Sequence, residues 1–452
     1  MECAIIAPLS KGVIITNNSL GLPEFTVITV YEDDDSRSLM YEVEAVSSPR
    51  ACPKCGCVGA FYKHTLDERI VQDIPSHGKL AYLKIMSRRY KCKDCNATFQ
   101  EEFDCVDGKE RLTARFRKHL QEMCLTDTFA RIARDSSLSI NTVRRIFQEY
   151  IDEKSKLLVY KAPRVLGIDE DHVNKIFRFV ITDSENNELL DILPDRETST
   201  ITSFFNRMDE KRNVKVVTMD MYRPYRAIIK NTFPSACIVV DKFHVVQLTN
   251  RKMDEVRKSI RDNMSAAERK RFLYLSKLMK SNKEDISERS AQTLRDAFIE
   301  YPILGTAYYL KEHIRGMYKS RSRYEAGQLF NQVRRSIPAD CASLVTLKNS
   351  LEEWAEEIMN YFDHPYTNAY TESANNLIKA INKESRSMSF EQLRYKILFY
   401  TRATKLPRFR PKQAAYKPSN SYSMVTPWSF MDEKPQLERG FGVDIDALIE
   451  EL

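Results

Sequence analysis

Two short runs of apolar, mostly branched residues, each followed directly by an aspartate, constrain the fold of this chain more than any other feature. Residues 164–168 lead to Asp169, and residues 214–219 lead to Asp220. Such runs are typical of buried strands, and the whole of 164–245 alternates strand-like with helix-like patterns, which indicates an α/β sheet. Because sites in open α/β sheets form at strand ends, two neighbouring strands that stop at acids would bring their carboxylates together.

A third acid, Glu372, lies far downstream in the first turns of a polar-faced helical segment. Three carboxylates from separated elements are suited to hold two Mg²⁺ ions, or Mn²⁺ in their place, because these cations take oxygen ligands. A metal pair of this kind favours the cutting and joining of a phosphodiester. Each aspartate alone could instead cap a turn. Rival ligands stay open: Glu170, Asp171, Asp183 and Asp241.

Length and charge limit the classes of protein to which this chain can belong. A chain of 452 residues is too long for one core and suggests three or more units. Residues 251–325 hold eighteen basic and eleven acidic side chains, which indicates a positive surface for a phosphate backbone, although a solvated helical surface has the same composition.

No run reaches the roughly 18 apolar residues of a membrane span, and the start lacks a signal-peptide pattern. We therefore expect a cytoplasmic protein without a membrane partner.

Two pairs of cysteines have the spacing of zinc knuckles. The expected ligands are Cys52, Cys55, Cys92 and Cys95. Each pair places two thiolates across a tight turn, so that together they complete a tetrahedral sulfur site for one structural Zn²⁺. In a reducing compartment this pattern favours metal binding over disulfides. Cys57 and His64 lie near the first pair and are alternative ligands.

Residues 126–147 have the pattern of a helix, a short turn and a second helix. Small and apolar side chains recur where two helices would cross closely, and Ser139 can cap the second helix. Four polar side chains would then point outward from a recognition helix: Asn141, Thr142, Arg144 and Arg145. Arginines in that position can reach guanine edges or phosphates. Two packed helices with a basic exposed face, and no DNA, would have the same pattern.

The patterns divide the chain into five expected parts. These are a β-hairpin region over 1–50, a zinc ribbon over 51–105, a helix-turn-helix domain over 111–152, a catalytic domain over 160–402 with a helical insertion at about 250–365, and an irregular tail over 405–452. The hairpin is indicated by alternating apolar residues over 25–31 and 39–46. The tail is rich in proline and ends on acids.

The motifs and their order resemble the ISL-three group of bacterial insertion-sequence transposases. The resemblance covers about residues 20–402 and rests on CPKCG at 52–56, RRYKCKDC at 88–95, GIDE at 167–170, DMYRPY at 220–225, VDKFHVV at 240–246 and TESANN at 371–376. It implies a zinc ribbon, a helix-turn-helix and an RNase H-like DDE catalytic domain interrupted by an all-α insertion. By this resemblance Asp169, Asp220 and Glu372 occupy the DDE positions. Asp241 and His244 match a further family motif, with an expected structural or DNA-positioning role.

The resemblance implies a DNA transposase that binds the terminal inverted repeats of an insertion sequence and catalyses metal-dependent strand cleavage and strand transfer. Its partners would be double-stranded DNA, as element ends and as target, and further copies of the chain in a homo-oligomer on DNA. Its place would be the bacterial cytoplasm, in association with the nucleoid. Three residues beyond Glu372 on the same helix side are expected to hold the DNA backbone: Asn375, Asn376 and Lys379.

Two other functions are compatible with the same motifs. One is a domesticated, sequence-specific DNA-binding regulator without transposition activity, and the other is a metal-dependent nuclease that cuts without joining. The intact acids argue against the regulator, because a pure DNA binder gains nothing from negative charge beside DNA. The chain also departs from the family at Ser373, where members usually carry glycine after the catalytic glutamate.

Overall fold

A computed structural model describes residues 20–33, 37–107, 111–261, 264–385 and 388–404. All of these precede Pro407, at which the chain divides into two units. The expected irregular tail over 405–452 lies outside the described residues, as do residues 34–36 between the two strands of the expected hairpin. Within the described ranges, every helix is too short or too polar to cross a membrane.

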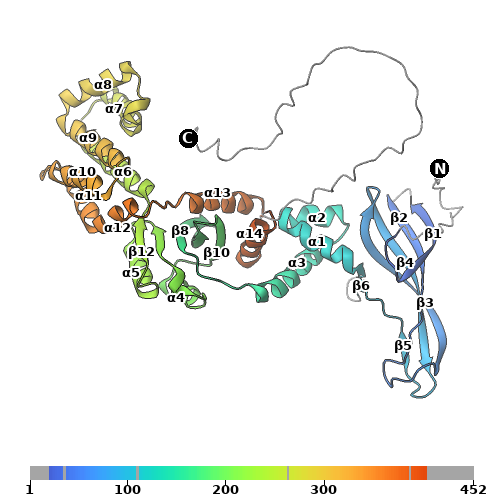
Figure 1. The fold of residues 1–452 in the computed structure, drawn as a ribbon. Coiled ribbons are helices and arrows are strands. Elements are labelled where there is room, and N and C mark those ends of the chain that lie inside the picture. Colours follow the sequence, from blue (N-terminus) through green and yellow to red (C-terminus); the bar gives the residue numbers. More distant parts are fainter. Residues whose placement is uncertain (1–19, 34–36, 108–110, 262–263, 386–387, 405–452) are drawn as a thin grey trace, which may run out of the picture. The chain divides into compact units, whose positions relative to one another are not determined.

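The N-terminal part folds into a seven-stranded sheet (Figure 1). Its strands are β1 (Phe25–Asp33), β2 (Ser38–Ala45), β3 (Phe61–Ser76), β4 (Lys79–Cys92), β5 (Thr98–Gln100), β6 (Val106–Asp107) and β7 (Leu112–Thr113). β1 and β2 pair antiparallel, as the alternating apolar residues predict. β2 also pairs in parallel with β4, so the hairpin shares one sheet with the strands of the cysteine-rich segment. The expected boundary between a hairpin region over 1–50 and a zinc ribbon over 51–105 thus falls inside one continuous sheet.

Three helices follow this sheet. They are α1 (Ala114–Thr126), α2 (Phe129–Asp135) and α3 (Ile140–Lys154), with the 3₁₀ turn η1 (Ser155–Leu157) after them. Ser139 caps α3, as predicted, by accepting a hydrogen bond from the backbone N–H of Thr142 at 3.0 Å. Ile132 of α2 and Val143 and Ile146 of α3 are completely buried. These apolar residues let α2 pack closely on α3.

A second, five-stranded sheet carries the predicted acids, in the order β10-β9-β8-β11-β12. Its strands are β8 (Val165–Val173), β9 (Ile176–Asp183), β10 (Glu188–Leu193), β11 (Val216–Met219) and β12 (Cys237–Val240). β8, β9 and β10 form an antiparallel meander, whereas β11 runs parallel to both β8 and β12. Most residues of these strands are buried, as their continuous apolar runs predict for a sheet covered on both faces.

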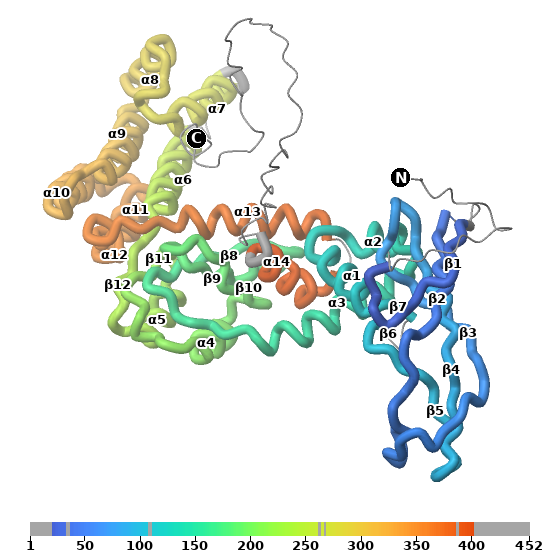
Figure 2. Tube along the Cα trace, turned by 45° about the vertical axis from the view of Figure 1, so that its right-hand side comes forward, coloured from blue at the N-terminus to red at the C-terminus, as the bar shows by residue number. Residues whose placement is uncertain are grey.

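Helices cover both faces of this sheet. They are α4 (Thr198–Asn206) and α5 (Arg223–Thr232) on one face, with the 3₁₀ turn η2 (Lys211–Asn213) between them, and α13 (Ala369–Glu384) and α14 (Phe390–Thr404) on the other. Phe179 and Ile181 of β9 join the cluster of α4 and α5, and Val180 between them joins that of α13 and α14. This alternation follows from the two-residue period of a strand. Figure 2 shows α13 running along the sheet.

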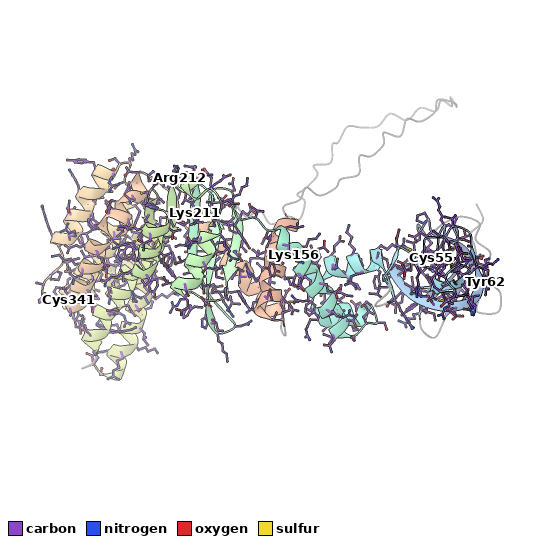
Figure 3. The ribbon with its side chains drawn as sticks, turned by 90° about the horizontal axis from the view of Figure 1, so that it is seen from below. Cys55, Tyr62, Lys156, Lys211, Arg212 and Cys341 are labelled. Atoms are coloured by element: carbon purple, nitrogen blue, oxygen red, sulfur yellow. The ribbon has the colours of Figure 1, made fainter. Side chains whose placement is uncertain are left out.

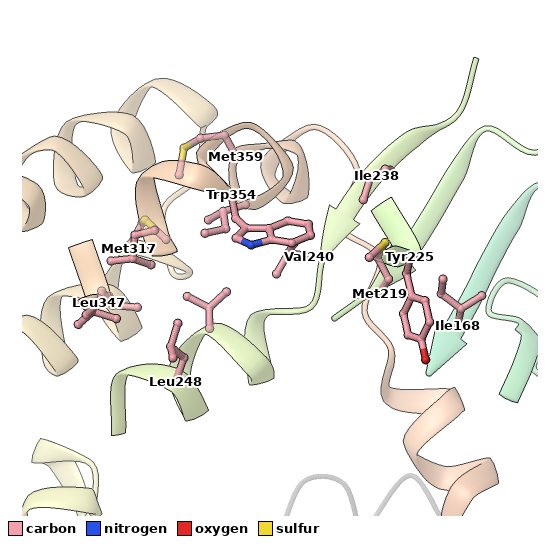
Figure 4. Packing of buried hydrophobic residues seen from close by; sticks show 14 of the residues in the cluster. Ile168, Met219, Tyr225, Ile238, Val240, Leu248, Met317, Leu347, Trp354 and Met359 are labelled. Atoms are coloured by element: carbon pink, nitrogen blue, oxygen red, sulfur yellow. The ribbon is translucent and has the colours of Figure 1, made fainter. Parts of the chain in front are cut away.

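The helices expected at about 250–365 are present, and residues 242–261 and 264–368 contain no strand. They are α6 (Lys242–Arg261), α7 (Ala266–Lys280), α8 (Glu288–Glu300), α9 (Pro302–Met317), α10 (Arg323–Arg335), α11 (Ala342–Glu353) and α12 (Ala355–Met359), with the 3₁₀ turns η3 (Lys283–Asp285) and η4 (Asn360–Phe362). The helical part begins directly after β12, a few residues earlier than expected. Its apolar side chains continue the core of the α4 and α5 face, where Trp354 lies beside Val240 (Figure 4).

Candidate active site

Asp169 lies inside a strand and not at its end. β8 continues from Asp169 to Val173, because residues 169–173 pair antiparallel with residues 176–180 of β9. The prediction that this strand stops at its acid was therefore wrong. The carboxylate is buried, with 8% of the residue exposed.

The parallel strands nevertheless bring three aspartates to one level of the sheet. Asp220 directly follows β11, as predicted, and Asp241 directly follows β12. Met219 lies opposite Val240, so the next residues on these strands, Asp220 and Asp241, emerge side by side. The register between β11 and β8 likewise places Asp220 level with Asp169. This is the edge at which α/β sheets form sites.

Glu372 reaches these aspartates because a buried asparagine ties its helix to the sheet. Asn368, at the N-cap of α13, is completely buried. Its side-chain amide donates to the carbonyl oxygen of Ile168 at 3.0 Å, and its Oδ1 accepts from the hydroxyls of Thr218 at 3.1 Å and Thr371 at 2.8 Å. One side chain thus joins β8, β11 and α13. A fully satisfied buried network of this kind fixes the position of the helix and hence of Glu372.

Gly167 allows the same helix to approach β8. A Cβ atom at this position would lie 2.4 Å from the hydroxyl of Thr182 and 2.6 Å from that of Thr371. Those two hydroxyls are 2.7 Å apart and hydrogen-bonded to each other. Neither Asn368 nor Gly167 is among the site residues predicted from the sequence. A polar residue before a helix signals only a cap, and the bonds from Asn368 to two strands depend on contacts distant in sequence.

His244 stands at the centre of the acids. Two groups have ligand atoms within 4.8 Å of one another: Asp169, Asp220 and His244, and Asp241, His244 and Glu372. The three predicted DDE residues therefore do not form one group by themselves among the described residues. Instead His244, from the first turn of α6, belongs to both groups, and its Nε2 lies 2.6 Å from Oδ1 of Asp220.

The buried ligand atoms fit a divalent cation. Asp220 Oδ1, His244 Nε2 and Glu372 Oε1 are buried without a hydrogen bond of acceptable geometry to any described residue, the short contact between Asp220 and His244 included. Buried polar atoms are almost always paired, and an unpaired one has a free-energy cost. Carboxylate oxygens and an imidazole nitrogen are ligands for Mg²⁺, Mn²⁺ and related cations. A cation would therefore supply the partner that these atoms lack.

The electrostatics agree with this fit. Burial and, after it, the nearby carboxylate of Asp220 raise the pKa of Asp169 to about 7. Burial is also the first cause of the raised pKa values of Asp241 and Glu372, to which neighbouring carboxylates add. A bound cation favours the charged form of all these groups. Clusters of carboxyl groups with raised pKa values are typical of functional sites.

Two of the rival acids are bound elsewhere. Glu170 accepts hydrogen bonds from Arg196 at 2.8 Å and from the hydroxyl of Tyr225 at 2.9 Å. Asp183 accepts from two backbone N–H groups of the turn that follows it, each at 3.0 Å, which is the turn-capping role of an aspartate at a strand end. Of the rivals, only Asp241 joins the cluster.

The position of Asn375 on α13 differs from the predicted outward position of a DNA contact. Asn375 does not face outward: it is buried and donates to Oδ2 of Asp169 at 2.8 Å, so it orients a candidate ligand. Lys379 is exposed, but it forms an ion pair with the buried Asp171 at 2.9 Å. Asn376 is exposed. DNA contact by Asn376 and Lys379 stays a prediction.

The four cysteines gather into one group in the N-terminal sheet: Cys52, Cys55, Cys92 and Cys95. The sulfur atoms are 3.8 Å apart between the first and last of these, and 3.6 Å apart between Cys55 and Cys92. The edge of a zinc–sulfur tetrahedron with 2.3 Å bonds is about 3.8 Å, so the spacing fits Zn²⁺. A backbone N–H of Cys95 lowers the pKa of Cys92 to about 6, which favours the thiolate that binds metal. Figure 3 shows Cys55 and Tyr62 in this part of the chain.

The alternative zinc ligands differ in their positions. His64 is exposed on β3 and is outside the group of four. The Sγ atom of Cys57 lies 3.2 Å from that of Cys92, although Cys57 is also outside the group. Cys57 is therefore the nearer of the two alternatives.

The predicted DNA-reading residues share the outward side of α3. Asn141 and Arg145 are exposed and Thr142 and Arg144 are half-buried, whereas Val143 between them is completely buried. Arg144 donates to the side-chain oxygen of Asn141 at 3.2 Å. The orientation suits a recognition helix, and contact with DNA stays a prediction.

Comparison with known proteins adds the family. The model of the ISL-three transposase family, described as "Transposase", matches residues 166–397, and one described as "zinc-finger of transposase IS204/IS1001/IS1096/IS1165" matches residues 48–95. The transposase for insertion sequence element IS1001 of Bordetella parapertussis is 24% identical over 366 residues, which cover 78% of this chain and 89% of that protein. The first match spans more than half of the chain and includes the whole acid cluster. The chain therefore belongs to the ISL-three family of transposases.

Proposed function

We propose that this transposase binds the terminal inverted repeats of an insertion sequence, cuts a DNA strand there and joins the freed 3′ end to target DNA. The observation that carries the proposal is the cluster of four carboxylates around His244, in which Asp220, His244 and Glu372 each have a buried ligand atom without a hydrogen bond to the described residues. Neither alternative function accounts for it. A DNA-binding regulator has no use for four carboxylates held together against their mutual repulsion, and membership of a transposase family favours joining over cutting alone.

The catalytic domain is proposed to be RNase H-like. An antiparallel three-stranded meander followed by two parallel strands, with helices on both faces, supports this assignment. α1, α2 and α3 are proposed as a helix-turn-helix DNA-binding domain over about 111–152, and the N-terminal sheet as the zinc-ribbon module. DNA is the proposed partner, bound by a homo-oligomer.

Mg²⁺ or Mn²⁺ would be held by Asp169, Asp220 and Glu372, with His244 and Asp241 beside them. When bound, such cations supply Lewis acidity and neutralise negative charge on a phosphodiester. The side chains of the protein prepare the site for this. Asn375 holds one oxygen of Asp169, the backbone N–H of Glu170 holds the other at 2.8 Å, and each oxygen keeps lone-pair capacity for a cation.

The test uses purified protein and a duplex that ends in the inverted repeat found beside the gene. In Mg²⁺ or Mn²⁺ we expect one strand to be cut at the repeat end and the 3′ end to be joined to a second, circular DNA. Sequencing of the junctions measures both steps. Cutting without joined product would instead favour the nuclease, and binding of the repeat without cutting would favour the regulator.

Replacing Arg144 and Arg145 together by alanine should separate end recognition from chemistry. Each contact to a base edge contributes about 1–3 kcal/mol of discrimination, so affinity for the repeat should fall at least about tenfold. Nicking of unrelated DNA should persist, because these residues lie on α3 and the acid cluster is held by the second sheet. The measurement is competitive binding to repeat and scrambled duplexes across a salt series.

The control for this variant is Lys154→Ala, which removes a half-buried cation from the last turn of the same helix. It should leave the preference for the repeat unchanged. If the double variant binds the repeat with wild-type affinity and preference, α3 does not read the DNA.

A further inference from the structure

A cavity of about 570 Å³ opens beside Asp220. Asp220 and His244 are among its lining residues, α6 forms one wall, and the start of α5 and the segment from α11 to α12 form the others. Its volume lies in the range of small-ligand sites, roughly 300 to 1,000 Å³. It is thus large enough for one nucleotide and too small for a duplex.

Three polar side chains of α6 line the cavity. His244, Gln247 and Arg251 are three and four residues apart, so they lie on one face of the helix. Gln247 and Arg251 are exposed, and neither makes a hydrogen bond or ion pair to the described residues. Arg251 lies about 10 Å along the helix from His244. It therefore offers a positive charge in the cavity about two helical turns from His244 and the acids.

Among the described residues, two neighbouring arginines, unlike Arg251, form ion pairs with nearby glutamates. Arg226 bonds Glu357 at 3.0 Å and stacks on the ring of Trp354 at 3.5 Å. Trp354 is consequently covered, and it forms a wall and not a free aromatic surface. Arg196 is likewise held by Glu170.

The opposite wall offers an aromatic platform. Tyr222 lies two residues after Asp220, in a turn closed by its own N–H and the Asp220 carbonyl at 2.8 Å, and the residue is 40% exposed. Its ring packs on that of Tyr225 in a T-shaped arrangement, with 4.6 Å between the centroids, and Tyr225 is fixed by its hydrogen bond to Glu170. Figure 4 shows Tyr225 beside Met219 and Ile168 in the core. An exposed ring supported in this way is suited to base stacking.

We propose that this cavity receives one nucleotide adjacent to the phosphate that is cut, swung out of the DNA helix, with its base stacked on Tyr222 and its phosphate beside Arg251. The inference rests on the proposed function. Enzymes that need access within a duplex extrude a nucleotide and offset the lost pairing with stacking and polar contacts in a pocket. Every base has a face that can stack, so the pocket accepts any of the four. The position of the cavity directly beside Asp220 makes the extruded nucleotide a neighbour of the reacting phosphate.

The test compares two duplexes that both carry the inverted repeat and both lack pairing at one position near the cut. In the first the base is present but mismatched, and in the second the site is abasic. Neither requires a pair to be broken, so the difference in affinity isolates stacking of the base. The position is moved through three nucleotides on each side of the cut. Binding is measured by fluorescence polarisation in Ca²⁺, and gel electrophoresis checks that the strand stays intact.

At one position the wild-type protein should bind the mismatched duplex about tenfold more tightly than the abasic one. Tyr222→Ala should abolish this preference, and Tyr222→Phe should retain it because the ring is kept. Arg251→Gln should weaken binding of both duplexes and reduce the salt dependence by about one charge, whereas Arg251→Lys should do so less. Equal thermal unfolding of these variants is expected because both side chains are exposed.

The inference is overturned if the wild-type protein distinguishes the two duplexes at none of the positions, or if Tyr222→Ala keeps the preference. Failure of the proposed function has a different signature. In that case the wild-type protein would neither prefer the repeat over a scrambled duplex nor cut it, whatever base stands at the tested position.

Discussion

Asp169→Asn, Asp220→Asn and Glu372→Gln should each reduce cutting of element ends to background while leaving binding of the ends measurable. The amides are nearly isosteric with the acids, so they remove the charge that holds a cation without opening a cavity. A bound cation supplies several kcal/mol of transition-state stabilisation, so the loss in rate should be at least about 1,000-fold. The measurement is the initial rate of strand cutting, together with Mn²⁺ affinity by calorimetry.

The matched control is Asp183→Asn. Asp183 is buried in the same sheet, but its carboxylate caps a turn and lies outside the acid cluster. Its amide variant should keep Mn²⁺ affinity and cutting within about threefold of wild type. If one of the three variants cuts at the wild-type rate, that residue does not belong to the site. Loss of cutting without loss of Mn²⁺ affinity would assign the residue to DNA positioning.

The strands and their acids could be predicted because the signal is local. A short branched apolar run followed by an aspartate is visible in a few letters, and β11 ends directly before Asp220 as expected. The end of β8 could not be predicted in this way, because the strand is prolonged by pairing with β9 through residues 169–173. The length of a paired strand depends on its partner segment, and the residues of the strand itself do not show where that partner pairs.

The role of His244 shows the same limit. A histidine three residues after Asp241 is compatible with many roles, and only the register of β11 and β12 places its helix against Asp220. Asn375 shows the converse error. Its spacing from Glu372 correctly indicates a shared side of α13, but the Asn375 side chain on that side is buried against the sheet and bonds to Asp169. Helical periodicity gives the face of a helix, and tertiary packing decides what the face meets.

Cys92→Ser should remove zinc and unfold the N-terminal sheet. Cys92 is completely buried at the end of β4, and it joins Cys95 on the far side of a tight turn. Structural zinc contributes about 10 to 16 kcal/mol of binding free energy, and whole domains are stable by only about 5 to 15 kcal/mol. Loss of the zinc-binding free energy is therefore expected to unfold the sheet. Elemental analysis should fall from one Zn²⁺ per chain to near zero, and limited proteolysis should cut within residues 20–107.

The effect should stay confined to that sheet. The strands β1 to β4 bury a hydrophobic cluster of their own, distinct from the clusters on the two faces of the second sheet. Mn²⁺ affinity at the acid cluster should therefore survive in Cys92→Ser, while binding of DNA weakens. Zinc close to zero in the wild-type protein purified without chelator would contradict the assignment outright.

Cys57 matters if Cys92→Ser loses only part of its zinc. Its sulfur lies 3.2 Å from that of Cys92, near enough to replace the missing ligand after a small shift of the turn. Cys57→Ser alone should keep zinc at one per chain, because the four other thiolates complete the tetrahedron. If Cys92→Ser retains some zinc, the double variant Cys57→Ser/Cys92→Ser should lose it. Zinc that persists in the double variant would mean that the metal is held by other ligands, and loss of zinc in Cys57→Ser would make Cys57 one of the four.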